Sequence, residues 1–139
     1  MSRADNVWIV DDDRSIRWVL EKALQQEGME PVSFDNADTA LSRLQRQCPD
    51  VLISDIRMPG SSGLELLAAA REQYPQLPVI IMTAHSDLDS AVASYQGGAF
   101  EYLPKPFDVD EAVALVRRAL AHTREQEALA PEQELGRTP

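Results

Sequence analysis

The chain is poor in the residues that most often carry disulfide or thiol chemistry. Among 139 residues there is one cysteine, Cys48, which excludes an internal disulfide. Its place in "RQCPDV" favours a side chain that packs at the entrance of a strand over a nucleophile. The sequence therefore assigns no chemistry to this thiol.

Long apolar runs and clusters of basic residues are also missing. No apolar run could cross a bilayer, and the N-terminus lacks a basic segment followed by an apolar one. The chain has 13 basic and 23 acidic residues, a net charge of −10, with no Lys/Arg cluster that could follow a phosphate backbone. We therefore expect a cytoplasmic, soluble protein in which this segment contacts neither nucleic acid nor membrane.

What the sequence does have is the length and the apolar content of one domain. With 44% hydrophobic residues it can bury a substantial core. The last residues are polar, contain two prolines and show no sustained apolar stripe. We predict one domain over residues 1–122, and a helix end with a polar linker over 123–139 that leads to an output region beyond the sequence.

Five apolar runs have strand character: residues 6–10, 31–34, 51–54, 78–82 and 99–103. The stretches between them and after the last run have helical periodicity, and those beginning at Ser86 and Asp108 also have capping-box spacing. This alternation predicts an α/β fold with a parallel sheet covered on both faces. The continuous first, third and fourth runs favour central strands, whereas Pro31 favours an edge position for the second.

Polar residues gather at the ends of these runs. In open α/β sheets, ligands bind beyond the carboxyl ends of the strands, so side chains there converge at one rim. The acids, hydroxyl and ammonium that fall at such ends are Asp11, Asp12, Asp13, Asp55, Thr83 and Lys105.

Crowded carboxylates are stable only if some remain protonated or a cation binds among them. Oxygen ligands with no histidine or cysteine nearby favour a hard ion such as Mg²⁺. An aspartate can attack a phosphoryl group, and the metal with Lys105 would offset charge on the transferring oxygens. We assign the nucleophile to Asp55, which stands alone at its strand end and faces the acids of the first.

The motifs "VDDD", "SDIRMPGSSG", "MTA" and "EYLPKPFD" resemble those of the receiver domains of two-component response regulators, over residues 6–121. The longer stretches "PVIIMTAHSDLDSAV" and "DEAVALVRRA" resemble the NtrC class of nitrogen regulators, which activate transcription by σ54 polymerase. The resemblance implies a flavodoxin-like, doubly wound (βα)5 fold with strand order 2-1-3-4-5. It also implies a sensor histidine kinase as partner, AAA+ ATPase and DNA-binding output domains in a longer chain, and homodimer formation on phosphorylation as a further expectation.

The same resemblance implies roles for the site residues. Asp55 is the phospho-acceptor, and Mg²⁺ is held by Asp12, by Asp55, by the backbone carbonyl of Arg57 and, through water, by Asp11. Thr83 and Lys105 contact the phosphoryl group, with a Lys105–Pro106 peptide bond that is usually cis, and Tyr102 is the switching aromatic. Asp13 is either a ligand or a helix cap. His85 is typical of the closer class, and its role stays open.

These assignments predict a regulatory domain rather than an enzyme, whose fourth helix and fifth strand change conformation on phosphorylation to control transcription, in nitrogen regulation. A Mg²⁺-dependent aspartyl-phosphate phosphohydrolase is the alternative, although Arg57 stands where its second acid would lie and the chain has no cap domain. A flavin or nucleotide carrier is a third reading, but acids follow the first strand where such proteins place a phosphate cradle.

Overall fold

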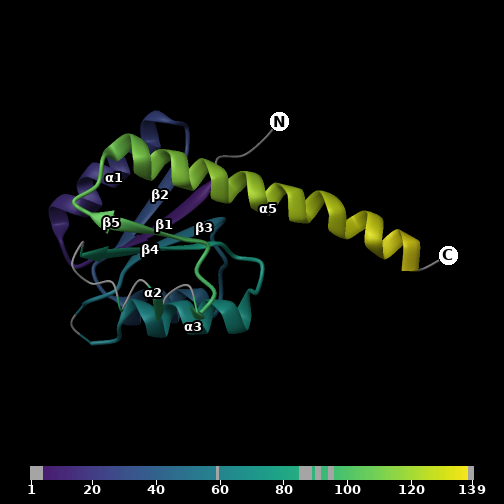
Figure 1. Cartoon of the computed structure of the whole chain (residues 1–139), viewed down its shortest axis with the longest axis horizontal. Helices are drawn as coiled ribbons and strands as arrows, with labels where there is room; N and C mark the ends of the chain where they lie inside the picture. The colour runs from purple at the N-terminus through teal and green to yellow at the C-terminus, as the bar shows by residue number, and fades with distance from the viewer. Residues whose placement is uncertain (1–4, 59, 85–88, 90–91, 94–95, 138–139) are drawn as a thin grey trace.

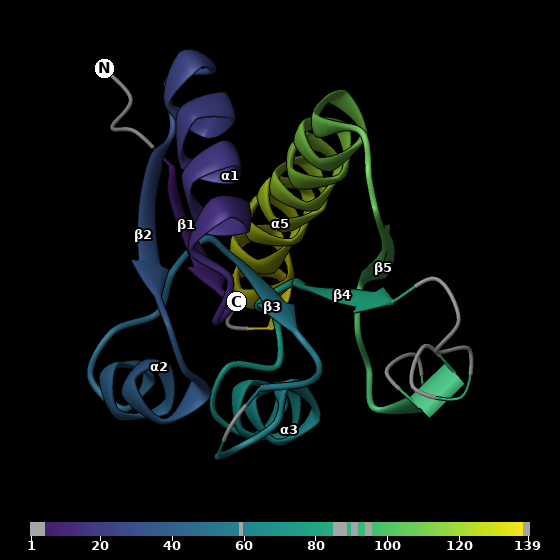
Figure 2. The ribbon, with the colours of Figure 1, turned by 90° about the vertical axis from the view of Figure 1, so that its left-hand side faces the viewer.

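A computed structural model describes residues 5–58, 60–84, 89, 92–93 and 96–137, with side chains described as far as Thr123. Its centre is a parallel sheet in the order β2-β1-β3-β4-β5, which confirms the predicted fold and the edge position of the second strand (Figures 1 and 2). The strands are β1 (Asn6–Val10), β2 (Glu30–Phe34), β3 (Val51–Asp55), β4 (Val79–Ala84) and β5 (Glu101–Lys105).

Helices cover both faces of the sheet. Figure 2 shows α1 (Arg14–Gln26) and α5 (Val109–Arg137) on one face, with α2 (Ala37–Leu44) and α3 (Gly63–Gln73) on the other. Each face has its own apolar cluster. The domain therefore has the two outer helical layers that a parallel sheet needs to bury both of its surfaces.

The strand β1 illustrates why the central runs are apolar throughout. Val7 and Ile9 belong to the cluster beneath α1 and α5, whereas Trp8 and Val10 belong to the cluster against α2 and α3. Side chains alternate between faces along a strand, so a strand covered on both sides needs apolar residues at every position.

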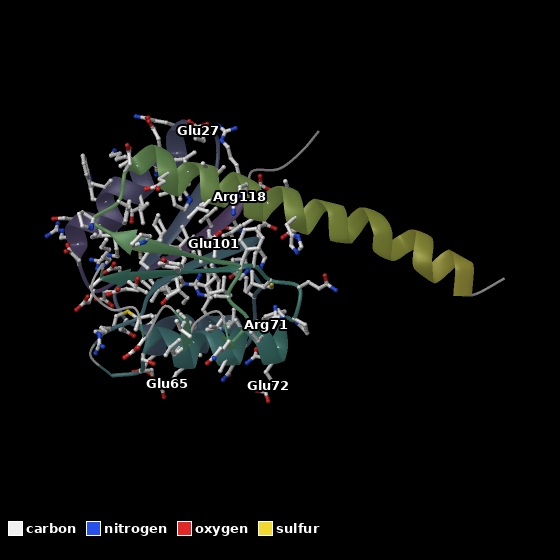
Figure 3. All side chains as sticks on the ribbon, in the orientation of Figure 1. Glu27, Glu65, Arg71, Glu72, Glu101 and Arg118 are labelled. Carbon is white, nitrogen blue, oxygen red and sulfur yellow. The ribbon has the colours of Figure 1, made fainter. Side chains whose placement is uncertain are left out.

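The strand β5 lies two residues later than the sequence predicts, at Glu101–Lys105 instead of 99–103. It includes Pro104, which pairs with Thr83 of β4. Since β5 is an edge strand, it tolerates a proline that cannot donate to a further neighbour. Its first residue, Glu101, accepts a hydrogen bond from Arg118 of α5 at 3.0 Å, so β5 is tied to that helix at the end opposite Lys105 (Figure 3).

The last helix is longer than predicted. The sequence predicts a helix end and linker over residues 123–139, but α5 continues to Arg137 and projects away from the sheet (Figure 1). The segment beyond Thr123 is rich in alanine, glutamate, glutamine and leucine, which favour helix. The segment expected to be a linker is therefore helical as far as Arg137, and the division into a domain over residues 1–122 and a following segment stays a prediction.

Two further expectations concern the fourth helix and membrane-spanning segments. The fourth helix, predicted to begin at Ser86, lies largely outside the described residues. Within the described ranges, no helix combines the length and the apolar character that a membrane span requires.

Candidate functional site

The strand register brings the polar strand ends to one edge of the sheet. Val10 of β1 pairs with Ser54 of β3, so the next residues, Asp11 and Asp55, stand at the same level on neighbouring strands. On the far side of β4, Ala84 pairs with Lys105. Residues far apart in the sequence therefore meet at the carboxyl ends of β1, β3 and β5.

Three carboxylates form a cluster at this edge. Asp11, Asp12 and Asp55 each offer an oxygen atom, and these atoms all lie within 4.8 Å of one another. Asp11 is completely buried and Asp55 is 8% exposed, whereas Asp12 is exposed. The cluster therefore opens to solvent beside Asp12, where an ion or a phosphoryl donor could enter.

Lys105 lies between the two buried acids. Its Nζ atom is 3.0 Å from Oδ2 of Asp11 and 3.3 Å from Oδ1 of Asp55. Burial alone would lower the pKa of Lys105, but the hydrogen bond to Asp11 and the charges of both acids raise it above 10.5. The side chain is therefore a fixed ammonium at neutral pH.

Asp55 has the opposite balance. Burial and the charge of Asp11 raise the pKa of Asp55 above its usual 3.8, while Lys105 and the backbone N–H of Ile56 act to lower it. The carboxylate is thus held in a place that disfavours its negative charge. A positive ion beside it would relieve this penalty.

The turn after β1 separates the roles of its acids. Asp13 is the N-cap of α1, and its carboxylate accepts the backbone N–H of Ser15 at 2.9 Å. Its own N–H donates to Oδ1 of Asp11 at 2.8 Å, and Arg17 donates to the carbonyl of Asp11 at 2.7 Å. Of the two readings of Asp13, the structure supports the helix cap.

The loop after β3 is fixed at both ends. Ile56 donates its N–H to Met82 of β4 at 3.1 Å, and Gly63 donates its N–H to Ile56 at 2.8 Å. A Cβ atom at Gly63 would lie 2.1 Å from the carbonyl oxygen of Asp55, so the start of α3 can approach the nucleophile candidate only with glycine there. The sequence analysis does not identify Gly63, although a glycine at the start of a helix in "SSGLELL" could have indicated a close backbone contact there.

The other residues that the resemblance assigns to the site differ in burial and in position. Thr83 is buried, with 2% exposure, in β4 at the site edge. Tyr102 is half-buried and packs against the cluster on the α2 and α3 side. The Lys105–Pro106 peptide bond is cis, as expected. Arg57 lies in the loop after Asp55, and His85 lies outside the described residues.

The donor set fits a small divalent cation. Three carboxylates against one ammonium leave two negative charges at the cluster. The three carboxylates each offer an oxygen atom within 4.8 Å of the other two, so they are near enough to share one small ion. The oxygen-only chemistry also favours a hard ion. Asp11, Asp12 and Asp55 are therefore the residues that could hold a metal.

Cys48 takes no part in this site. It lies just before β3, at the end of the sheet opposite the acids, and its Sγ contacts the carbonyl of Pro49 at 3.3 Å. Burial and the charge of Asp50 raise the pKa of the thiol to about 11, which disfavours the reactive thiolate. The side chain of Cys48 is exposed, so the expectation that it packs at the strand entrance is wrong.

An apolar groove of about 270 Å³ lies next to the site, between α1 and the start of α5. Its apolar lining comes from Ile16 and Val19 on one side and from Pro106 and Phe107 on the other. Trp18, one turn along α1, is 59% exposed. Lys22 lies over its ring, 5.8 Å from the centroid.

Comparison with known proteins places these observations in a family. Residues 7–117 match the response regulator receiver domain. The chain is 64% identical over 121 residues to the DNA-binding transcriptional regulator NtrC of Proteus hauseri, covering 87% of this chain and 26% of that protein. The NtrC of Escherichia coli K12 is 62% identical over the same share of each chain. The chain thus spans about a quarter of the length of these relatives.

Solved structures agree in fold. The solution structure of the BeF3-activated receiver domain of nitrogen regulatory protein C is 61% identical, with a TM-score of 0.75, over 88% of this chain and 98% of that one. The crystal structure of NtrX from Brucella abortus in complex with ADP is 31% identical, with a TM-score of 0.85, over 91% of this chain and 29% of that one.

Proposed function

The chain belongs to the response regulator receiver domain family, among receivers of the NtrC type, and on this premise we propose that Asp55 accepts a phosphoryl group from a sensor histidine kinase. The observation that carries the proposal is the surroundings of Asp55. Its carboxylate is nearly buried, stands within reach of two further acids, and lies 3.3 Å from a lysine ammonium. This is an environment for a nucleophile whose product carries more negative charge.

In the proposed reaction, a carboxylate oxygen of Asp55 attacks the phosphorus of a phosphohistidine. The O–P bond forms, the N–P bond breaks, and the imidazole leaves and takes a proton from solvent. The attacking carboxylate must be ionised, and Lys105 favours this form because it lowers the pKa that burial and Asp11 raise. Lys105 then remains beside the phosphoryl oxygens and balances part of their charge.

We place Mg²⁺ on Asp12, Asp55 and the backbone carbonyl of Arg57. When bound, the ion neutralises charge on the transferring phosphoryl oxygens. Asp12 is the exposed acid at the opening of the cluster, so it can gain a ligand without losing a buried contact. Asp11 is fully buried and already paired with Lys105 at 3.0 Å, which supports contact through a water molecule instead.

Thr83, Lys105 and Tyr102 would convert the new charge into a change of shape. Thr83 and Lys105 would contact the phosphoryl oxygens, and both lie at the ends of neighbouring strands. Tyr102 lies earlier in the same strand as Lys105, packed on the α3 side of the sheet. The proposed movement affects β5 and the segment after β4, where the role of His85 stays open.

The name NtrC of the relatives supports nitrogen regulation as the setting, with ATPase and DNA-binding output domains in a longer chain. Homodimer formation on phosphorylation belongs to the same proposal. For the kinase, the apolar groove between α1 and Pro106 offers a docking surface next to the site, with Trp18 exposed on the same helix.

The test is incubation with a small phosphodonor such as acetyl phosphate and Mg²⁺, followed by intact mass and exposure to hydroxylamine. We expect one added phosphoryl group on the wild-type chain, lost with hydroxylamine, and no stable label on Asp55→Asn. Asp35→Asn, which changes an exposed acid on the β2–α2 connection, is the matched control and should be labelled normally. Full labelling of Asp55→Asn would contradict the assignment, and rapid turnover of unrelated phosphate esters would favour a phosphohydrolase.

A further inference from the structure

The loop that follows Asp55 is bound to a helix that takes no part in the site. Ser61 of this loop donates its hydroxyl to Oδ1 of Asp38, in the first turn of α2, at 2.5 Å. The two residues are 23 positions apart in the sequence, so the contact joins separate segments. Ser61 belongs to the motif "SDIRMPGSSG" that holds Asp55, whereas Asp38 lies outside the motifs that carry the resemblance.

A second observation indicates that α2 and this loop fit closely. Gly60, next to Ser61, has a φ of +82°, and a Cβ atom there would lie 3.0 Å from the other carboxylate oxygen of Asp38. Both oxygens of Asp38 thus face the loop. The backbone turns there in a conformation that favours glycine, which lets the loop approach the helix.

The position of this loop matters for the metal. The loop begins at Asp55, passes through Arg57 and ends at Gly63, where α3 starts. Its two ends are held by backbone hydrogen bonds of Ile56 and Gly63. The bond between Ser61 and Asp38 acts between these two ends, so we expect it to restrain the loop that carries Arg57.

We propose that Asp38 is a positioning residue for the metal site, acting as a hydrogen-bond acceptor that holds the loop after β3 against α2. This inference rests on the proposed function, because it takes the carbonyl of Arg57 as a metal ligand. Asp38 does not touch the metal or the phosphoryl group. Its effect on Mg²⁺ passes through Ser61 and the loop backbone.

A net hydrogen bond of ordinary strength sets the expected size of the effect. Asp38→Ala and Ser61→Ala should each raise the Mg²⁺ concentration for half-saturation by roughly three- to tenfold. The double variant should show no further loss, because both changes remove the same bond. At saturating Mg²⁺ the labelling rate should return to near the wild-type value, since the nucleophile and Lys105 are untouched.

Asp38→Asn separates the hydrogen bond from the charge. The amide oxygen still accepts from Ser61, so this variant should stay within about twofold of the wild type. If instead Asp38 acted only by attracting Mg²⁺ through its charge, Asp38→Asn would behave like Asp38→Ala, and Ser61→Ala would behave like the wild type. Asp35→Ala removes a nearby exposed charge whose carboxylate accepts a hydrogen bond from the side chain of Asn36, and this variant should leave the metal dependence unchanged.

The measurement is a Mg²⁺ titration followed by amide chemical shifts of the site, with the labelling rate measured in parallel and urea unfolding as a check of the fold. The shifts report metal binding whether or not the chain is labelled, so this test does not depend on phosphorylation. A wild type that binds Mg²⁺ but is never labelled would refute the proposed function alone. Unchanged half-saturation in both Asp38→Ala and Ser61→Ala, or the charge-only pattern, would overturn the role of Asp38.

Discussion

Replacing Lys105 with methionine tests how the site tolerates its buried acids. Methionine retains most of the apolar stem but removes the ammonium that lies 3.0 Å from Asp11 and 3.3 Å from Asp55. The variant leaves Asp11, Asp12 and Asp55 close together without a protein cation between them. We expect Lys105→Met to lower the free energy of unfolding in the absence of Mg²⁺.

The size of this loss follows from burial. Removing one partner of a fully buried ion pair costs about 3–5 kcal/mol, because it leaves an uncompensated charge. Here the Asp11 side chain is fully buried but that of Lys105 is 23% exposed, so solvent screens part of the interaction. We therefore expect a loss of about 2–4 kcal/mol at pH 7, which would lower the urea midpoint by roughly 1–2 M.

The loss should depend on pH in a defined direction. The pKa of Asp55 is raised above 3.8 by burial and by Asp11, and Lys105 works against this rise, so the variant should raise it further. When the pKa of a group is higher in the folded state than in the unfolded state, its contribution to stability is complete below the unfolded-state pKa. That contribution is lost as the pH rises through the folded-state pKa. The deficit of Lys105→Met should therefore shrink as the pH falls from 7 toward 4.

At alkaline pH the stability that Lys105 contributes is also lost as the pH rises. The folded-state pKa of Lys105 is raised above 10.5, so its stabilisation is complete below that pH and is lost as the pH rises through the folded value. The difference between variant and wild type should therefore be largest from neutral to mildly alkaline pH. Adding Asp55→Asn should reduce the deficit by about 1–2 kcal/mol, because one of the unpaired charges is gone.

The assay is urea unfolding followed by circular dichroism at several pH values, with EDTA present. Lys22→Met is the matched control, because this exposed lysine contacts the Trp18 ring instead of a carboxylate and its replacement should change stability by less than about 0.5 kcal/mol. An unchanged midpoint for Lys105→Met at pH 7 would refute the reasoning. A deficit that is independent of both pH and Asp55→Asn would show that lost packing, not charge, explains the change.

Two further variants test the acid turn and the loop. Asp12→Ala should raise the Mg²⁺ concentration for half-maximal labelling by about tenfold or more, and should leave the free energy of unfolding in urea unchanged or slightly higher. An unchanged Mg²⁺ titration would move the ligand role to Asp11. Gly63→Ala should lower the free energy of unfolding by about 1–3 kcal/mol and slow labelling, because the added Cβ atom would lie 2.1 Å from the carbonyl oxygen of Asp55. If this variant kept the stability and the labelling rate of the wild type, the packing argument would be wrong.

The central strands and the location of the site could be predicted because both depend on local sequence patterns, whereas the strand order was implied by the resemblance to receiver domains. The apolar runs of β1 and β3 are buried on both faces, so their pattern alone locates these strands and the acids that follow them. The edge strand β5 is less well defined, since its pattern includes Pro104 and the polar Lys105. This is why its predicted position is two residues too early.

Contacts between distant segments could not be predicted in the same way. Neither the sequence pattern of α2 nor that of the loop after β3 indicates that Asp38 and Ser61 meet, because the contact depends on how α2 packs. Asp13 presents a related difficulty, since a carboxylate at a helix start is equally suited to cap the helix or bind an ion. Only the direction of its side chain, toward Ser15, decides between these roles.

The charged residues of the site lie on strands that differ in how firmly the sheet holds them. Asp11 and Asp55 lie at the ends of β1 and β3, each hydrogen-bonded to a strand on both sides, so these carboxylates cannot move apart to relieve their repulsion. Lys105 belongs to β5, which among the described strands pairs with β4 alone, and the opposite end of β5 is held to α5 through Glu101 and Arg118 (Figure 3). A change of charge on Asp55 should therefore displace Lys105 and the end of β5 more readily than the central strands. Because Tyr102 lies on the same strand, this difference in constraint gives the proposed switch a physical route from the site to the edge of the sheet.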